Sequence, residues 1–150
     1  MRLIIGFLIL GAFFAACKKT SPEEQARIDR NIILDYLNQN DLEAEETADG
    51  IFYFKTEVGN GAQPVENDDV LVAYKGYYTN NGVFDESDPT GIEFNLQQVI
   101  QGWTKGIPLF KEGGRGTLLI PSGLAYGPDG RGSVPANAVL IFDIHLIEVL

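Results

Sequence analysis

Apolar and polar residues alternate along several stretches after residue 50, as they do in β-strands with one buried face. The pattern predicts strands over residues 51–56, 70–78, 82–85, 92–94, 116–120 and 139–150. The shared face of the longest two consists of Val70, Val72, Tyr74, Gly76 and Tyr78 in one and Leu140, Phe142, Ile144 and Leu146 in the other. We therefore expect a sheet with one face in the core and the other in water.

Two stretches have helical periodicity instead. Ser21-Pro22-Glu23-Glu24 is a typical helix start, and apolar residues at positions 28, 32 and 36 predict a helix over residues 22–38. Residues 99–110 predict a second helix, kept short by Gly102, Gly106 and Pro108. The acidic segment 41–50 is expected to be a solvated linker, with an interaction segment as the alternative. Residues 121–136 are rich in Gly and Pro and predict a long shaped loop.

These elements together predict an α+β fold, with an antiparallel sheet of about five or six strands wrapped around a short helix. The folded domain is expected at residues 50–150, preceded by the extra N-terminal helix and acidic linker at residues 22–49. The N-terminal helix is amphipathic, so it is expected either to lie on its own domain or to mediate dimerisation.

The start of the chain has a different character. An uncharged apolar stretch at residues 3–16 follows Arg2 and ends in Ala15-Ala16, which is typical of a secretory signal peptide and too short to span a bilayer as a helix. Phe14-Ala15-Ala16-Cys17 resembles a bacterial lipobox, which implies cleavage before Cys17, diacylglycerol on its thiol and an acyl chain on its new amino group. The alternatives are an ordinary cleaved signal with an incidental Cys, or a short anchor that stays attached.

We therefore expect a signal peptide at residues 1–16 and a lipidated Cys17 with a tether at residues 17–21. The domain is then expected in the bacterial cell envelope, held on a membrane by its lipid, in the periplasm or at the cell surface.

Composition excludes several classes of function. The formal net charge of −10 argues against nucleic acid as a partner, because phosphate binding requires a basic surface. A single Cys and a single His leave no metal-ligand cluster and no hydrolytic triad, so we expect neither a metal site nor a cofactor. His145 lies in the last predicted strand, where it is expected to face solvent or a neighbouring strand rather than to be catalytic.

Aromatic residues carry the remaining signal. They are spread over five predicted elements: Tyr74, Phe84, Phe94, Trp103, Tyr126 and Phe142. Most are expected to fill the core. Trp103, however, is flanked by Gly102 and Gly106, which leave room above the indole, and Tyr126 lies in the Gly/Pro loop. Together they predict an apolar pocket for a small ligand.

Several strings resemble FKBP-type peptidyl-prolyl isomerases in order and spacing over residues 51–150. They include Tyr74-Lys75-Gly76-Tyr77, Gly82-Val83-Phe84-Asp85, Gln98-Val99-Ile100-Gln101-Gly102-Trp103, Leu124-Ala125-Tyr126-Gly127, Val134-Pro135-Ala136-Asn137 and Leu140-Ile141-Phe142-Asp143. The resemblance implies a catalytic set of Asp85, Tyr126, Phe84 and Trp103, with Trp103 beneath the substrate proline ring. It implies substrate-binding positions at Tyr74, Phe94, Val99, Ile100, Val134 and Phe142. The segment 85–92 lacks the Arg that some members pair with the pocket carboxylate.

The function that this resemblance implies is isomerisation of Xaa-Pro bonds in proline-containing exported polypeptides, with a macrolide as a potential inhibitor. Two alternatives stay open. One is a non-catalytic proline-binding module. The other is a structural lipoprotein subunit of an envelope complex that uses residues 22–38 as a docking arm.

Overall fold

The computed structural model describes residues 20–150. The predicted signal peptide, the lipobox and Cys17 therefore lie outside the described residues. Within residues 20–150, no helix is both long and apolar enough to cross a membrane.

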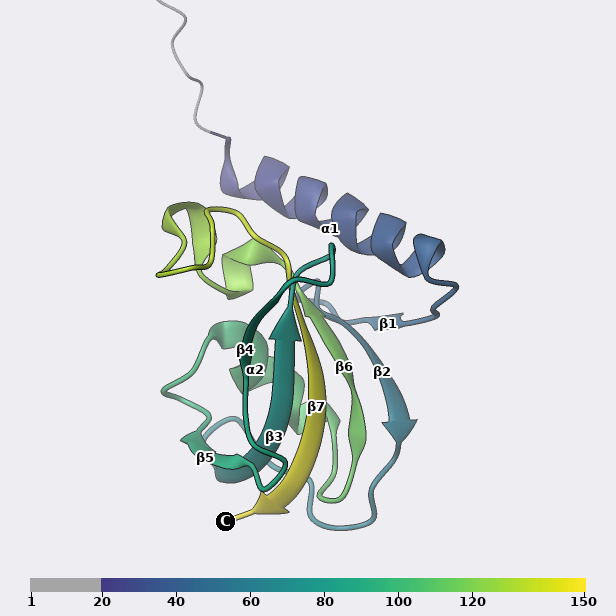
Figure 1. Cartoon of the computed structure of the whole chain (residues 1–150), viewed down its shortest axis with the longest axis vertical. Helices are drawn as coiled ribbons and strands as arrows, with labels where there is room; N and C mark the ends of the chain where they lie inside the picture. Colours follow the sequence, from purple (N-terminus) through teal and green to yellow (C-terminus); the bar gives the residue numbers. More distant parts are fainter. Residues whose placement is uncertain (1–19) are drawn as a thin grey trace, which may run out of the picture.

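One antiparallel sheet of seven strands forms the frame of the molecule (Figure 1). Its strands are β1 (Glu45–Glu46), β2 (Phe52–Glu57), β3 (Asp69–Tyr77), β4 (Val83–Glu86), β5 (Ile92–Asn95), β6 (Arg115–Ile120) and β7 (Leu140–Val149). Their order is β1-β2-β6-β7-β3-β4, and β5 pairs separately with β3. Six of these strands match the predicted α+β sheet, and β1 is the additional one.

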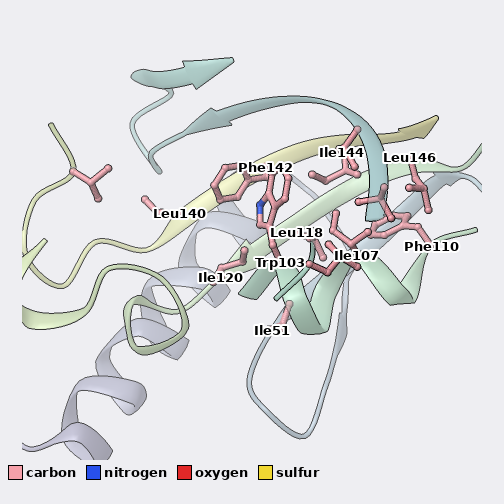
Figure 2. Close-up of a cluster of buried hydrophobic side chains, with 14 residues drawn as sticks. Ile51, Trp103, Ile107, Phe110, Leu118, Ile120, Leu140, Phe142, Ile144 and Leu146 are labelled. Atoms are coloured by element: carbon pink, nitrogen blue, oxygen red, sulfur yellow. The ribbon is translucent and has the colours of Figure 1, made fainter. Parts of the chain in front are cut away.

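A short helix lies against the inner face of this sheet, as predicted. It is α2 (Gln101–Gly106), which begins two residues later than expected. It continues into one turn of 3-10 helix, η1 (Ile107–Leu109). Gly102 allows the close approach, because a Cβ at this position would overlap Ile120 Cγ2 on β6. The predicted inward residues of β7 all lie in this core, together with Trp103, Ile107, Phe110 and Leu118 (Figure 2).

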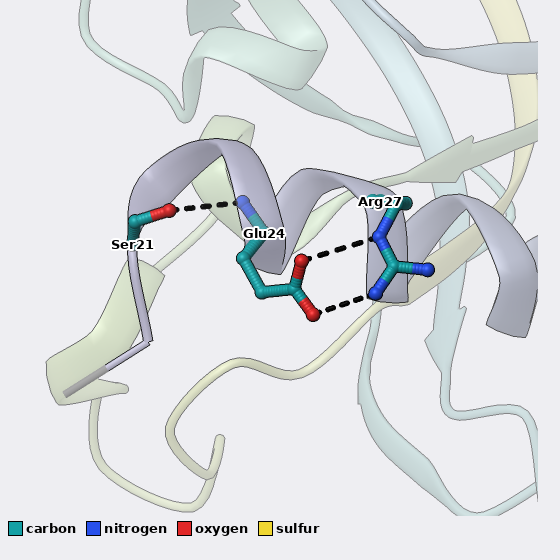
Figure 3. Close-up of polar contacts among 3 residues, drawn as sticks. All are labelled: Ser21, Glu24 and Arg27. Carbon is teal, nitrogen blue, oxygen red and sulfur yellow. Dashed lines mark hydrogen bonds and ion pairs between the residues drawn. The ribbon is translucent and has the colours of Figure 1, made fainter. Parts of the chain in front are cut away.

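The N-terminal helix α1 (Pro22–Gln39) agrees closely with the predicted range. Ser21 caps it, because its Oγ accepts a hydrogen bond of 3.2 Å from the backbone N–H of Glu24 (Figure 3). Arg27 then donates to both carboxylate oxygens of Glu24 one turn later (Figure 3). This ion pair is exposed, so it contributes little to stability.

Part of the outer face of the sheet is buried, which corrects the expectation from strand alternation that this face lies in water. α1 lies across it, and a second buried cluster forms there from Ile33, Tyr36, Leu37, Phe52, Leu119, Val139 and Ile141. Of the two arrangements expected for this helix, the structure has the helix on its own domain. The buried face of α1 is Asp29, Ile33, Tyr36 and Leu37, so the predicted position 36 is buried, whereas positions 29 and 33 are buried in place of the predicted 28 and 32.

The segment 41–50 is not simply a solvated linker. β1 pairs with β2, with Glu45 opposite Tyr53 and Glu46 opposite Phe52. Arg30 of α1 donates two hydrogen bonds of 2.8 Å to the Glu46 carboxylate. The segment thus joins the helix to the edge of the sheet, although its side chains remain largely exposed.

The turn between β3 and β4 and the loop at residues 121–136 both form where the sequence predicts them. Asn81 has a φ of 65°, which Asn tolerates better than most residues, and it turns the chain from β3 into β4. Residues 121–136 form a shaped loop containing two 3-10 turns, η2 (Ser122–Leu124) and η3 (Gly127–Asp129).

His145 lies half-buried on the outer face of β7. It lines a groove of about 470 Å³ together with Lys75, Arg115 and Asp143. Burial and the nearby Arg115 charge lower the pKa of His145. Its neighbours in β7, Ile144 and Leu146, belong to the core on the opposite face, so His145 points away from the aromatic cluster described below.

Candidate active site

A cavity of about 370 Å³ opens between the inner face of the sheet, α2 and the 121–136 loop. The sheet contributes four aromatic side chains and one carboxylate, while α2 and the segment before it form the base. The lining residues are Tyr74, Phe84, Asp85, Phe94, Gln98, Val99, Ile100, Trp103, Ala125, Tyr126, Arg131 and Phe142. Only Asp85 and Arg131 of this lining are charged side-chain types, and six of the twelve lining residues are aromatic.

Trp103 lies at the base of this cavity. Three rings pack edge-to-face against its indole, with centroid distances of 5.0 Å to Tyr74, 5.2 Å to Phe94 and 5.3 Å to Phe142. Such T-shaped pairs are favourable because the positive edge of one ring meets the negative face of the other. The Trp103 side chain is therefore locked in one orientation. Its Nε1–H is buried and donates to no atom of residues 20–150.

The carboxylate of Asp85 is tied to the same aromatic group. Asp85 Oδ2 accepts a hydrogen bond of 2.7 Å from the hydroxyl of Tyr74. Burial and the neighbouring Asp85 charge raise the pKa of Tyr74, so this phenol stays protonated and remains a donor. This hydrogen bond fixes Asp85 at the pocket edge.

The opposite edge of the cavity is formed by the loop. The guanidinium carbon of Arg131 lies 5.9 Å from the centroid of the Tyr126 ring, within the range of a cation–π contact. At the base, Ile100 precedes the first turn of α2, and its backbone N–H donates to no acceptor among the described residues. The cavity therefore has hydrogen-bonding groups around an apolar centre.

Most residues of this lining are among the positions predicted from the sequence. Asp85, Tyr126, Phe84, Trp103, Tyr74, Phe94, Val99, Ile100 and Phe142 all lie around the cavity. Val134 does not, because its side chain is 7 % exposed and packs in the core. Its backbone instead forms a two-way bridge with Arg131, so Val134 holds that residue in place.

Gln98, Ala125 and Arg131 are lining residues that the sequence analysis missed. Gln98 and Ala125 are direct neighbours of predicted site residues, and that adjacency was the available signal. Arg131 lies five residues beyond Tyr126, and only the folded loop returns it to the cavity.

The chemistry available here is limited to binding and hydrogen bonding. In the part of the chain that is described, no group of three or more His, Cys, Asp or Glu side chains is arranged to hold a metal ion. The cavity lining contains no Ser, Thr, Cys, Lys or His to serve as a nucleophile. The arrangement suits a reaction in which a bound group changes conformation without bond cleavage.

Fold and cavity together define the class of protein: an α+β domain with an aromatic-lined cavity on the inner face of its sheet. The family model of the FKBP-type peptidyl-prolyl cis-trans isomerases matches residues 60–147, and this chain belongs to that family. The resemblance noted from the sequence strings is thereby confirmed.

Curated relatives agree with this assignment. The chain is 45 % identical over 106 residues to the probable FKBP-type peptidyl-prolyl cis-trans isomerase FkpA of Neisseria meningitidis serogroup B. The match covers 69 % of this chain and 39 % of the relative. The chain thus spans about two fifths of the length of the first curated relatives that it matches.

Solved structures extend the likeness to the fold. The crystal structure of FkpA from Escherichia coli superposes with a TM-score of 0.73 at 34 % identity, covering 85 % of this chain and 62 % of that one. A peptidyl-prolyl cis-trans isomerase from Pseudomonas syringae pv. tomato has a TM-score of 0.74 at 31 % identity, covering 88 % and 98 %. These matches confirm the predicted α+β fold.

Proposed function

We propose that this chain isomerises Xaa-Pro bonds in exported polypeptides, with the proline ring bound over Trp103. The observation that carries the proposal is the open, aromatic-lined cavity of about 370 Å³, with Asp85 and Tyr126 on its lining. Its volume lies in the range of small-ligand pockets. The family to which the chain belongs is defined by the same reaction.

The reaction needs no nucleophile or cofactor. The barrier to rotation about a peptide bond is about 18–20 kcal/mol because amide resonance is lost as the bond twists. Uncatalysed Xaa-Pro exchange takes tens of seconds or longer, slow enough to limit folding. Each tenfold acceleration needs the barrier lowered by about 1.4 kcal/mol, so a few favourable contacts to the twisted bond are sufficient.

The aromatic walls lower this barrier because they exclude water from the bound peptide bond. A planar amide has more charge separation than a twisted one, so an apolar pocket disfavours the planar ground state. Trp103 and Phe142 grip the proline ring while the preceding carbonyl remains free to turn. Binding is then stronger for the twisted form than for the planar form, which is the condition for catalysis.

The rim and the base of the cavity supply directional contacts. Tyr126 donates its hydroxyl proton to a substrate carbonyl, and the unpaired N–H of Ile100 donates to a second carbonyl. Asp85 accepts from a backbone N–H of the substrate beside the proline while it also accepts from Tyr74. Asp85 and Tyr126 thus hold the peptide on both sides of the rotating bond.

A peptide isomerisation assay tests the proposal. The full chain is incubated with short peptides that contain Leu-Pro, Glu-Pro or Lys-Pro, and the cis-to-trans rate is measured. We expect acceleration of all three, and block by a macrolide that fills the cavity. If correctly folded protein leaves every rate at its uncatalysed value, the proposed activity is wrong.

Arg131 is expected to determine the relative kcat/KM values of the Glu-Pro and Lys-Pro peptides. Its guanidinium forms no ion pair within the structure's described range, so it is available to a carboxylate of the substrate. An exposed pair of this kind is worth up to about 1 kcal/mol, or about fivefold. We expect Arg131→Gln to lower the Glu-Pro to Lys-Pro ratio of kcat/KM by up to about fivefold at low salt. Arg115→Gln on the outer face is the matched control and should leave the ratio unchanged.

Two other functions give different results in the same experiments. A non-catalytic binding module would bind these peptides without accelerating exchange. A structural subunit that uses α1 as a docking arm would have to bind its partner through the exposed face of the helix, because Ile33 and Leu37 on the other face are packed on the sheet.

Attachment to a membrane through lipid at Cys17 is part of the proposal and rests on the lipobox resemblance. It would place the domain in the cell envelope, where exported chains fold. Mass spectrometry of the mature N-terminal peptide tests it: we expect an acylated Cys17, and an unmodified terminus would contradict the anchor.

A further inference from the structure

Asp29 is the one fully buried carboxylate of the described helix–sheet interface. Its Oδ2 accepts two hydrogen bonds from Ser122, 2.8 Å from the backbone N–H and 2.6 Å from the hydroxyl. Its Oδ1 accepts a third, 2.7 Å from the side-chain amide of Gln25. No cation pairs with it among residues 20–150. Neutral donors alone therefore satisfy this buried carboxyl group.

Such an arrangement is not needed merely to hold α1 on the sheet. Burying a charge is costly, and an apolar side chain of similar size would pack α1 at least as well. Ile33 and Leu37 already do so one and two turns further along the same face. The distinctive property of Asp29 is directional: it specifies the position of one residue, Ser122.

Ser122 begins the short turn that leads into the cavity. The backbone N–H of Ala125 donates to the carbonyl of Ser122 at 3.0 Å, which closes this turn. Ala125 and the next residue, Tyr126, both line the cavity. The placement of the Tyr126 hydroxyl is thus linked to α1 through a chain of hydrogen bonds that starts at Asp29.

Little else supports the loop from the side of α1. A second cavity, of about 760 Å³, lies between the first turn of α1 and residues Gly123, Leu124 and Pro128 of the loop. Figure 1 shows the loop, in yellow-green, beneath the beginning of α1. The Asp29–Ser122 contact bridges the two elements beside this hollow.

We propose that Asp29 is a positioning residue of the candidate active site, acting through Ser122 to place Tyr126 against the substrate. The inference rests on the proposed function. It makes α1, which lies outside the family-matched residues 60–147, a working part of the site.

Three variants separate positioning from simple packing. Asp29→Leu removes both Ser122 bonds but keeps an apolar side chain of similar size. Asp29→Asn keeps them, because its Oδ1 accepts from Ser122 while its NH₂ faces Gln25, whose amide can turn its oxygen inward. Ser122→Ala removes only the hydroxyl bond and is the milder variant if Asp29→Leu does not fold. Ile33→Ala is the matched control, since it weakens the packing of α1 without touching Ser122.

We expect Asp29→Leu to lower kcat/KM about three- to tenfold, the value of one neutral hydrogen bond to the substrate. Ser122→Ala should lower it about twofold, and Asp29→Asn should stay within twofold of the parent. In a Tyr126→Phe background, Asp29→Leu should have no further effect, because both changes remove the same contact. Folded Ile33→Ala should keep the parent kcat/KM.

Full activity of folded Asp29→Leu, or losses that multiply in the double variant, would overturn the inference while the isomerase activity itself stands. If the parent chain shows no turnover, the proposed activity fails separately. Peptide affinity, followed by the fluorescence of the single Trp103, then gives the same double-variant comparison. A parent that neither turns over nor binds peptides overturns both.

Discussion

Replacing Asp85 with Ala is expected to lower kcat/KM for proline peptides roughly ten- to hundredfold while leaving the fold intact. The side chain is exposed at the pocket edge, and among residues 20–150 it bonds only to the Tyr74 hydroxyl, so its removal leaves no hole in the core. Hydrogen bonds to a charged group are worth about 1.5–3 kcal/mol, which sets the size of the effect. The measurement is peptide isomerisation, with circular dichroism to confirm folding.

Glu86→Ala is the matched control for this variant. Glu86 is the next residue along β4, is also an exposed carboxylate, and lines the groove on the outer face instead of the cavity. The two variants change the net charge equally. Equal activities of Asp85→Ala and Glu86→Ala would show that the carboxylate does not act on the substrate.

The second large effect concerns stability. Ile33→Ala is expected to lower the free energy of unfolding by about 2–5 kcal/mol, the usual cost of removing a buried Ile side chain. Ile33 is fully buried between α1 and the sheet. Against a total stability of about 5–15 kcal/mol for a typical domain, this loss is considerable. Urea denaturation of the variant and the parent measures it.

The neighbouring residue provides an internal control. Ile32 is 37 % exposed on the same helix, so Ile32→Ala should change the unfolding free energy by only about 0.5 kcal/mol. Both substitutions alter helix propensity identically, so the difference between them reports burial alone. Equal effects would mean that α1 does not pack on the sheet in solution.

The inner half of the fold was predictable because strand alternation records which side chains face the core. Leu140, Phe142, Ile144 and Leu146 follow that rule and are all buried. The outer face was not predictable in this way. Ile141 and Leu119 are buried there only because a helix distant in sequence covers them. Nothing local to either strand specifies where that helix lies.

Two further misses have the same origin. The apolar spacing of α1 predicts a face through Ile28 and Ile32, whereas the face that packs includes Asp29, whose burial depends on Ser122 far along the chain. β1 consists of two glutamates, which have no strand propensity, and it exists because the edge of β2 offers free backbone groups.

The candidate site was predicted where it rests on the sheet and α2. The spacing of those residues along the sequence is similar to that in FKBP-type isomerases, and they lie on or next to regular helices and strands. Their neighbours in space could therefore be predicted from the sequence motifs. The 121–136 loop behaves differently: its positive-φ glycines, Gly130 and Gly132, turn the chain so that Arg131 returns to the cavity and Val134 enters the core. Loop geometry of this kind depends on the finished packing.

If the domain is attached through lipid at Cys17, as proposed, the packing of α1 on the sheet would limit how far the domain can move from the membrane. α1 begins at Pro22 and is packed on the sheet, so it would not lengthen the tether between the membrane and the domain. The tether between the lipid and the helix would then consist of the five residues 17–21, which span about 18 Å when fully extended. The domain would then stay within a thin layer at the bilayer surface. It would bind exported polypeptides that are close to the membrane, and not those that have diffused away from it.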